Sequence, residues 1–201
     1  MVMDGIYYAA AFASGGAVIW YFAGPVFSIP MFLLGAFCLY FFRDPERSIP
    51  EGPVVVSPAD GKVMGVIPDG SGASRISIFL NIFDVHVNRA PIAGSITKVE
   101  YTKGQFLVAS KEAASSQNER NTVSIAGDGT CVAFAQIAGL IARRIVFNKN
   151  TGDTVGKGER VGLIKFGSRV DIFLGPEWEI AIKTGDRVAG GSSIVARRRD
   201  S

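Results

Sequence analysis

Residues 5–42 read GIYYAAAFASGGAVIWYFAGPVFSIPMFLLGAFCLYFF and contain no charged side chain. The pair Gly24-Pro25 divides this stretch into two apolar segments, Ile6 to Ala23 and Val26 to Phe42. Each segment is close to the roughly 17 to 25 residues that a helix needs to cross a bilayer. The stretch therefore predicts an N-terminal apolar helical hairpin, residues 1–42, that associates with a membrane.

The residues that flank this stretch indicate its orientation. Arg43 and Arg47 follow at once, and basic residues beside a span favour the cytoplasmic side. We therefore expect a cell-membrane protein whose body lies in the cytoplasm. A secretory signal peptide fits poorly, because Asp4 stands where a basic residue is expected and a second apolar segment follows. Two alternatives stay open: a hairpin buried in a soluble protein, and a hairpin that dips into the bilayer without crossing it, since Pro25 and Pro30 interrupt it.

The composition of the chain excludes several classes of protein. Its 201 residues are 48% hydrophobic, with a net charge of +3, 2 cysteines and 1 histidine. These values exclude a disordered chain and a strongly basic nucleic-acid-binding protein. Cys38 and Cys131 cannot form a disulfide framework or a cysteine-based zinc site, and no metal is expected. Any mechanism that needs an imidazole has one candidate, His86.

Beyond the hairpin, short runs of β-forming residues alternate with Gly, Pro and Asp. Helical periodicity is poor, and only residues 109–116 favour a short helix. Residues 43–201 therefore predict a mostly β domain, a compact barrel or sandwich with few short helices. The predicted strands are 53–56, 61–67, 75–82, 85–88, 94–101, 122–126, 131–137, 145–148, 160–166, 169–174 and 179–182.

An internal repeat relates residues 151–161 to residues 184–194, with Thr, Gly, Asp, Val and Gly shared. Both copies predict tight turns, because Gly supplies a positive φ and Asp bonds nearby backbone amides. The first copy has Glu159 where the second has Ser192. Ser192 thus places a hydroxyl on a glycine turn, and the fold does not itself require this hydroxyl. A Ser that follows Gly in such a turn can bring its Oγ onto the preceding carbonyl carbon.

Six motifs along the chain together resemble one family, the short form of the phosphatidylserine decarboxylase proenzymes, over essentially the whole sequence. The motifs are Phe41-Phe-Arg-Asp-Pro-Glu-Arg47, Ser57-Pro-Ala-Asp60-Gly, Phe83-Asp-Val-His86-Val-Asn-Arg-Ala-Pro91, Asn118-Glu-Arg-Asn121, Ile141-Ala-Arg-Arg-Ile145 and Gly191-Ser192-Ser193.

This resemblance implies a carboxy-lyase that converts phosphatidylserine in the membrane to phosphatidylethanolamine. It implies that Ser192 Oγ attacks the Gly191 carbonyl and that β-elimination then separates a large chain, 1–191, from a small chain, 192–201. The two chains would stay together as a heterodimer. A covalent pyruvoyl group left at residue 192 would form a Schiff base with the lipid amine, so that no metal or external cofactor is needed. Whether the protein forms homo-oligomers, and which lipid tails it accepts, stays open.

The resemblance also implies a relay in which Asp60 orients His86 and His86 takes the Ser192 proton. Longer bacterial members have two histidines three residues apart where this chain has His86 and Arg89. His86 could therefore serve self-cleavage, turnover or both, and Arg89 or a water could take one role. The residues expected to bind the lipid headgroup or phosphate are Asn118, Glu119, Arg120, Asn121, Arg143 and Arg144.

Two other functions stay open at this point. A membrane-anchored serine hydrolase would use Asp60, His86 and Ser192 and would keep its chain intact. A non-catalytic barrel of the biotinyl or lipoyl type fits the repeats, but it needs a modifiable lysine at a hairpin tip, and Lys62 and Lys157 lie only near turns. In both, residue 192 stays joined to Gly191.

Overall fold

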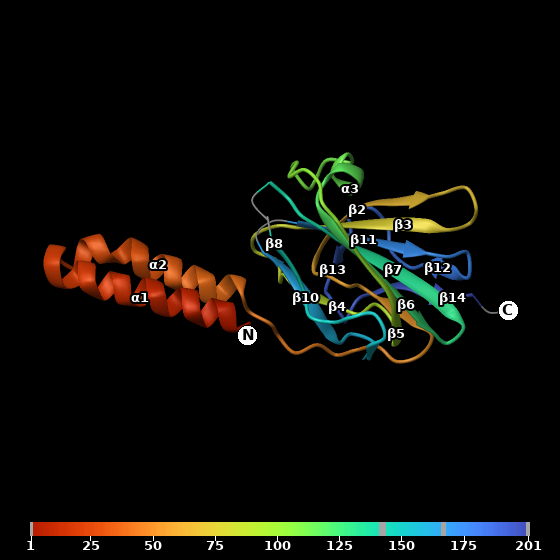
Figure 1. Ribbon diagram of the computed structural model, residues 1–201, viewed down its shortest axis with the longest axis horizontal. Coiled ribbons are helices and arrows are strands. Elements are labelled where there is room, and N and C mark those ends of the chain that lie inside the picture. Colours follow the sequence, from red (N-terminus) through yellow and green to blue (C-terminus); the bar gives the residue numbers. More distant parts are fainter. Residues whose placement is uncertain (1, 141–143, 166–167, 200–201) are drawn as a thin grey trace. The chain divides into compact units, whose positions relative to one another are not determined.

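The computed structural model covers the whole chain and describes residues 2–140, 144–165 and 168–199. The chain forms two compact units, Met1–Glu46 and Arg47–Ser201. The first unit is helical and the second is mostly β (Figure 1), which confirms the predicted fold class. The boundary between the units lies a few residues beyond the predicted end of the hairpin, because the extended segment after the second helix still belongs to the first unit.

The first unit is a hairpin of α1 (Met3–Ala23) and α2 (Pro25–Phe41). Gly24, with a φ of 96°, joins the helices, and Pro25 opens α2 at a position where its missing N–H costs no hydrogen bond. Small residues let the helices approach closely. A Cβ at Gly5 would lie 2.5 Å from Cβ of Phe42, and one at Gly16 would lie 3.0 Å from the Phe32 ring.

The outer surface of the hairpin is apolar. Tyr21, Phe22 and Val26 are 82%, 81% and 70% exposed. By length and composition α1 can cross a membrane, whereas α2, with 17 residues, is shorter than such a span usually is. These features suggest that the first unit associates with a membrane.

The second unit contains fourteen strands and one short helix among its described residues. The strands are β1 (Val54–Val56), β2 (Gly61–Pro68), β3 (Ser74–Leu80), β4 (Val87–Arg89), β5 (Gly94–Thr102), β6 (Arg120–Gly127), β7 (Thr130–Ile137), β8 (Arg144–Phe147), β9 (Thr154–Val155), β10 (Arg160–Lys165), β11 (Ser168–Leu174), β12 (Trp178–Ile180), β13 (Arg187–Val188) and β14 (Ile194–Arg198). The helix is α3 (Ala114–Gln117).

Three antiparallel sheets make up this unit. The largest has the order β13-β2-β3-β11-β7-β6-β5-β9 and curls into a half-barrel (Figure 1). The other two have the orders β1-β14-β12 and β4-β10-β8. Residues alternate between buried and partly exposed along β6, as in a sheet with one covered face. All three sheets contribute to one core, which includes Ile78, Ile125, Ile172, Val195 and Ile164.

The internal repeat forms the two outer edges of the largest sheet. Its copies supply β9 and β13, which lie at opposite ends of the strand order. In each copy the Asp side chain caps a tight turn: Asp153 accepts the N–H of Asn150 at 2.8 Å, and Asp186 accepts the N–H of Lys183 at 2.9 Å. The predicted turn chemistry of the repeat is therefore confirmed.

The strand predictions missed three elements. Two of them, β9 and β13, have only two residues each, and no run of β-forming residues marks so short an edge strand. The third, β14, was missed because its sequence, Ile194-Val-Ala-Arg-Arg198, lacks alternation and ends in basic residues. The helix expected at 109–116 is only α3, because most of that segment forms turns.

Candidate active site

The turn between β13 and β14 carries the Gly-Gly-Ser-Ser motif. The N–H groups of Ser192 and Ser193 both donate to the carbonyl oxygen of Ala189, at 3.1 and 3.0 Å. Gly191 has a φ of 80°, in the left-handed region that favours glycine. A Cβ at this position would also lie 2.9 Å from Cδ of Arg89 and 3.1 Å from Cδ1 of Ile49. Both the backbone conformation and the surroundings of the turn therefore require glycine at residue 191.

The segment Ser57–Asp60, between β1 and β2, holds this turn. The N–H of Gly190 donates to Asp60 Oδ1 at 2.8 Å, and the N–H of Gly191 donates to the Ser57 carbonyl at 2.8 Å. In return the N–H of Ser57 donates to the Ser193 carbonyl at 2.8 Å. The structure thus brings together Asp60, Gly191 and Ser192, three of the site residues expected from the sequence.

The two adjacent serines differ in how the fold uses them. The hydroxyl of Ser193 accepts the N–H of Ala189 at 2.9 Å and so helps to close the turn. Among the described residues, none donates to or accepts from the half-buried hydroxyl of Ser192. The hydroxyl of Ser193 therefore stabilises the turn, whereas the hydroxyl of Ser192 does not.

Arg47 fixes the carboxylate that contacts the turn. Its Nη2 donates to both oxygens of Asp60, at 3.0 and 2.8 Å. Each of the two side chains is only 16% exposed, so solvent screens this pair less than it would screen a surface pair. Arg47 thereby holds Asp60 in the orientation in which Oδ1 meets the Gly190 N–H.

Arg89 touches both turns of the internal repeat. It lies on β4 and is only 5% exposed, and its backbone N–H donates to the Pro58 carbonyl at 2.9 Å. Its Nη1 donates to the carbonyl of Gly158 at 3.1 Å, while its Cδ packs against Gly191. A buried guanidinium beside Gly191 favours negative charge that develops there.

His86 lies directly before β4 and is 2% exposed. Its Nδ1 is 2.9 Å from the carbonyl oxygen of Asp84. A carbonyl can only accept, so Nδ1 carries a proton, and Nε2 is the acceptor of the neutral ring. The hydrogen bonds of the Asp60 carboxylate go to Arg47 and Gly190, not to this ring. These hydrogen bonds therefore do not connect Asp60 with His86, so they do not form the expected relay in which Asp60 orients the His86 ring.

The loop that carries His86 is tied to the strand that leads into the turn. Asp84 Oδ2 accepts the N–H of Asn81 at 2.9 Å, which closes the loop locally. Asp84 Oδ1 accepts a hydrogen bond from Nη1 of Arg187 on β13 at 3.0 Å. Asp84 therefore couples the position of the His86 loop to the position of β13.

A buried chain of side-chain amides supports the same region, and the sequence analysis missed it. Asn121 Nδ2 donates to Gln136 Oε1 at 3.1 Å, and Gln136 Nε2 donates to Asn88 Oδ1 at 2.9 Å. Asn88 Nδ2 in turn points to the Pro58 carbonyl at 3.5 Å. Gln136 interrupts the apolar part of β7, from Cys131 to Ile137, and that interruption was the one available signal.

The expected headgroup residues serve largely to hold loops. Asn118 is buried: its Oδ1 accepts the N–H of Leu107 at 2.9 Å, and its Nδ2 donates to the carbonyls of Leu107 and Ala138 at 2.9 and 2.8 Å. Arg120 donates to the carbonyl of Ser116 at 2.7 Å. Asn121 belongs to the amide chain described above.

The remaining headgroup candidates lie nearer the surface. Glu119 accepts a hydrogen bond from the hydroxyl of Tyr101, and burial together with this carboxylate raises the pKa of Tyr101 to about 12. Arg144 is exposed at the start of β8. Arg143 lies outside the described residues. Within the described ranges no group of three or more His, Cys, Asp or Glu side chains is arranged to hold a metal ion.

Comparisons with known proteins identify the family. A family model described as phosphatidylserine decarboxylase matches residues 34–196. A phosphatidylserine decarboxylase proenzyme of Solibacter usitatus (strain Ellin6076) is 64% identical over 200 residues, which are 100% of this chain and 98% of that protein. Proteins of the same name from Desulfotalea psychrophila and Saccharopolyspora erythraea are 46% and 47% identical, over 83% and 82% of this chain and 82% and 74% of their own lengths. The chain therefore belongs to the phosphatidylserine decarboxylase family, and the enzyme class expected from its motifs is confirmed.

Proposed function

We propose that this protein decarboxylates phosphatidylserine to phosphatidylethanolamine with a pyruvoyl group that it makes by cleaving itself between Gly191 and Ser192. The observation that carries the proposal is the turn itself. Asp60 and Ser57 hold Gly190 and Gly191, and no described residue forms a hydrogen bond with the hydroxyl of Ser192, which follows the carbonyl that it would attack. The proenzyme names of the relatives support a processing step.

In the first step, Ser192 Oγ attacks the carbonyl carbon of Gly191 and the peptide nitrogen leaves as an amine. The peptide bond becomes an ester, and the Ser192 hydroxyl proton must pass to the peptide nitrogen. We assign this transfer to Asp60, which takes the proton from Oγ and gives it to the leaving amine, and its hydrogen bond to Gly190 supports the assignment. The buried guanidinium of Arg89 beside Gly191 would stabilise the charge on the carbonyl oxygen. Holding both reacting groups in one turn is worth about 7 to 11 kcal/mol when the geometry is near attack.

In the second step, the α-proton of residue 192 and the Gly191 carboxylate are lost by β-elimination. The dehydroalanine that remains tautomerises, and water replaces its nitrogen, which is released as ammonia. The products are a large chain that ends at Gly191 and a small chain that begins with a pyruvoyl group.

The fold supports retention of the small chain after cleavage. Its strand β14 is the central strand of the sheet β1-β14-β12. Val195 and Ala196 on this strand are fully buried in the common core. Backbone hydrogen bonds on both sides and this burial would keep the two chains together as a heterodimer.

During turnover the pyruvoyl group supplies a carbonyl that accepts the electrons released when the carboxylate of the substrate leaves. We assign the proton transfers of turnover to His86. The hydrogen bond between Nδ1 and Asp84 supports this assignment, because it leaves Nε2 as the position that gains and loses the proton. Asp60, in contrast, is engaged at the turn through Gly190 and Arg47.

We also propose that the second unit lies on the cytoplasmic side of the membrane. Arg43 and Arg47 follow the hairpin directly, as the positive-inside bias requires. The guanidinium of Arg43 lies 3.9 Å from the centre of the Tyr40 ring, and such a pair of amphipathic side chains suits the membrane interface.

The experiment that tests this function traps the carbonyl. Purified protein in mixed micelles with phosphatidylserine is treated with phenylhydrazine, and carbon dioxide release is measured before and after treatment. The proposal predicts that activity is lost and that the small chain gains the mass of the hydrazone. Full carbon dioxide release after treatment, with no change in the mass of the small chain, would rule out a pyruvoyl enzyme.

A further inference from the structure

Three loops of the second unit carry exposed apolar side chains. Ile82 and Phe83 follow β3 and are 39% and 61% exposed, Val108 follows β5 and is 41% exposed, and Leu140 follows β7 and is 54% exposed. We call these four residues the apolar loop end. Loop tips of a soluble protein are usually polar, so apolar side chains on three separate loops indicate a contact surface.

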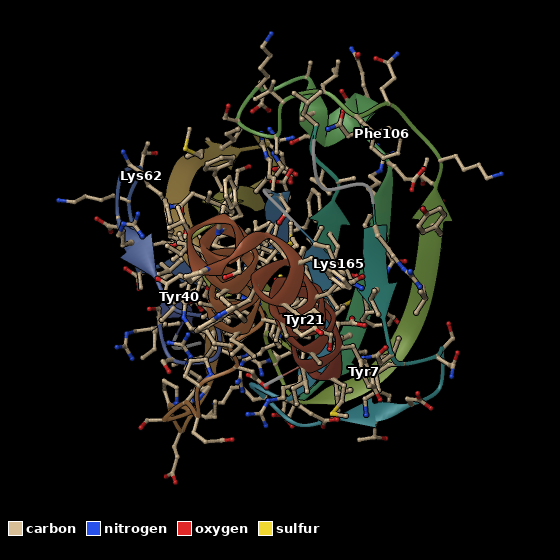
Figure 2. The ribbon with its side chains drawn as sticks, turned by 90° about the vertical axis from the view of Figure 1, so that its left-hand side faces the viewer. Tyr7, Tyr21, Tyr40, Lys62, Phe106 and Lys165 are labelled. Carbon is tan, nitrogen blue, oxygen red and sulfur yellow. The ribbon has the colours of Figure 1, made fainter. Side chains whose placement is uncertain are left out.

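The strand register places the three loops at one end of the largest sheet. Leu80 at the end of β3 pairs with Ser168, and Ile137 at the end of β7 pairs with both Arg169 and Arg120. Thr102 at the end of β5 pairs with Arg120 as well. Figure 2 looks onto this end, with Lys62 at one side and Phe106 beside α3.

Asn118 holds two of these loops against each other. Its amide bonds Leu107, next to Val108, and also Ala138, close to Leu140. Its side chain is 1% exposed, so it acts as a fixed clamp rather than as a surface group. Val108 and Leu140 are therefore presented on a braced surface rather than on independent loops.

The charges around the apolar loop end are mostly basic. Lys62, Lys103, Lys111 and Arg144 are exposed there. The acidic residues of the same region are engaged: Asp84 with Arg187, Glu112 with Arg75 and Arg169, and Glu119 with Tyr101. An apolar centre with a basic rim is complementary to a bilayer that contains anionic lipids.

The candidate active site lies toward the same end. β2 begins at Gly61, directly after the Ser57–Asp60 segment, and Val188 of β13 pairs with Gly61 just before the turn. Lys62 pairs with Phe79, near the end of β3 from which Ile82 and Phe83 follow. The turn with Ser192 and the apolar loop end are therefore on one side of the half-barrel.

We propose that the apolar loop end docks the catalytic unit onto the surface of an anionic bilayer, as a second membrane contact besides the hairpin. A second copy of the chain is a poorer occupant, because two basic rims would repel each other. The choice of a lipid surface rests on the proposed function, which takes a membrane lipid as its substrate. The docking itself does not depend on turnover, so the two proposals can fail separately.

Spin labels on the full chain test the docking. The chain offers its own control in Cys131, which is exposed at the far end of β7, where it pairs with Ala126. All labelled proteins carry Cys38→Ala. The control protein has the nitroxide at Cys131. The two test proteins also carry Cys131→Ser and have the nitroxide at Val108→Cys or at Leu140→Cys. Each protein is reconstituted into vesicles of phosphatidylcholine and phosphatidylglycerol, and collision with oxygen is compared with collision with a water-soluble nickel chelate.

The proposal predicts that labels at residues 108 and 140 collide with oxygen several-fold more than with the chelate, and that the label at Cys131 shows the reverse. Chelate accessibility equal to that of Cys131 at both positions would overturn the proposal. Spin–spin broadening that disappears when labelled protein is diluted with unlabelled protein would assign the surface to a second copy, and would also overturn it.

A pair of double variants separates docking from chemistry. Val108→Ser with Leu140→Ser removes apolar side chains from the apolar loop end. Ile67→Ser with Phe173→Ser removes two that are 37% and 40% exposed at the opposite end, where both pair with Arg75. We expect the first pair to lower the rate on phosphatidylserine in vesicles about tenfold, with unchanged rates on a dispersed short-chain substrate, and the second pair to change neither. Equal vesicle rates for the two pairs would contradict docking, whereas no decarboxylation by any variant or by the wild type would contradict the proposed function alone.

Discussion

The carboxylate of Asp60 accepts the backbone N–H of Gly190 at 2.8 Å and so joins two segments that lie 130 positions apart in the sequence. The same carboxylate accepts two hydrogen bonds from Arg47. Arg47 is the first residue of the second unit. The arrangement of the turn therefore depends on the residue at which the catalytic unit begins.

Asp60→Asn should slow self-cleavage strongly. The amide oxygen can still accept the Gly190 N–H, but the negative charge and its pairing with Arg47 are lost. Because Asn cannot take the Ser192 proton, cleavage should be about 100 to 10,000 times slower, which is the usual contribution of a general base. The fraction of split chain is measured by mass spectrometry over time after cell-free synthesis.

Arg47→Gln is the companion variant, since it removes the partner of Asp60 and leaves the carboxylate in place. It should slow cleavage less than Asp60→Asn does. Thermal unfolding of both variants, in a Ser192→Ala background, controls for loss of the fold. Wild-type cleavage rates in both variants would show that the Arg47–Asp60 pair has no part in processing.

Ser192→Ala and Ser193→Ala form a matched pair, because the residues are adjacent and the substitution is the same. Ser192→Ala should leave a single uncut chain without decarboxylase activity. Ser193→Ala loses the hydrogen bond to the Ala189 N–H, about 1 kcal/mol, and should still be cut, only several-fold more slowly. Gel electrophoresis with an activity assay distinguishes them, and an uncut Ser193→Ala protein beside a cut Ser192→Ala protein would reverse the assignment.

Glu159→Ser uses the internal repeat as a control within the chain. The two turns share two backbone features: Gly158 and Gly191 have φ values of 75° and 80°, and the residue after each donates to a carbonyl three positions earlier, at 3.0 and 3.1 Å. The variant therefore places a Gly-Ser pair on a second turn with these features. Because Asp60 contacts only the Ser192 turn, we expect no cut after Gly158. A fragment that ends at Gly158 would show that turn geometry alone drives cleavage.

His86→Ala should separate processing from turnover. Since the described hydrogen bonds of Asp60 connect it to the turn and not to His86, the variant is expected to be cut at close to the wild-type rate. Without the proton transfers at Nε2, decarboxylation should fall by about 100-fold or more. Mass spectrometry and carbon dioxide release are measured on the same preparation, and an uncut variant would make His86 the base for self-cleavage.

Much of the fold was predictable because local patterns decide it. The apolar stretch of residues 5–42 is long and uninterrupted by charge, and the helices Met3–Ala23 and Pro25–Phe41 follow it closely. The longer strands, such as Gly61–Pro68 and Thr130–Ile137, carry enough β-forming residues to be recognised. The edge strands Thr154–Val155 and Arg187–Val188 could not be found in this way, because two residues are too few to show a preference for β-structure. Their pairing with strands that are distant in the sequence defines them.

The sequence motifs indicated some residues that lie close together in the fold, but they did not indicate the contacts of those residues. The motifs that contain Asp60 and Gly191-Ser192 pointed to residues that the structure does bring together. The partner of Asp60, in contrast, was expected to be His86, and only long-range packing shows Arg47 in that place. The hydrogen bond between the buried amides of Asn88 and Gln136 was also missed. A single polar residue in a strand does not reveal which buried group it forms a hydrogen bond with.

The most direct test of the central claim is the intact mass of the purified wild-type protein. The account predicts two chains, one that ends at Gly191 and one of residues 192–201 whose first residue has the mass of a pyruvoyl group in place of serine. A single unbroken chain that nevertheless releases carbon dioxide from phosphatidylserine would contradict it.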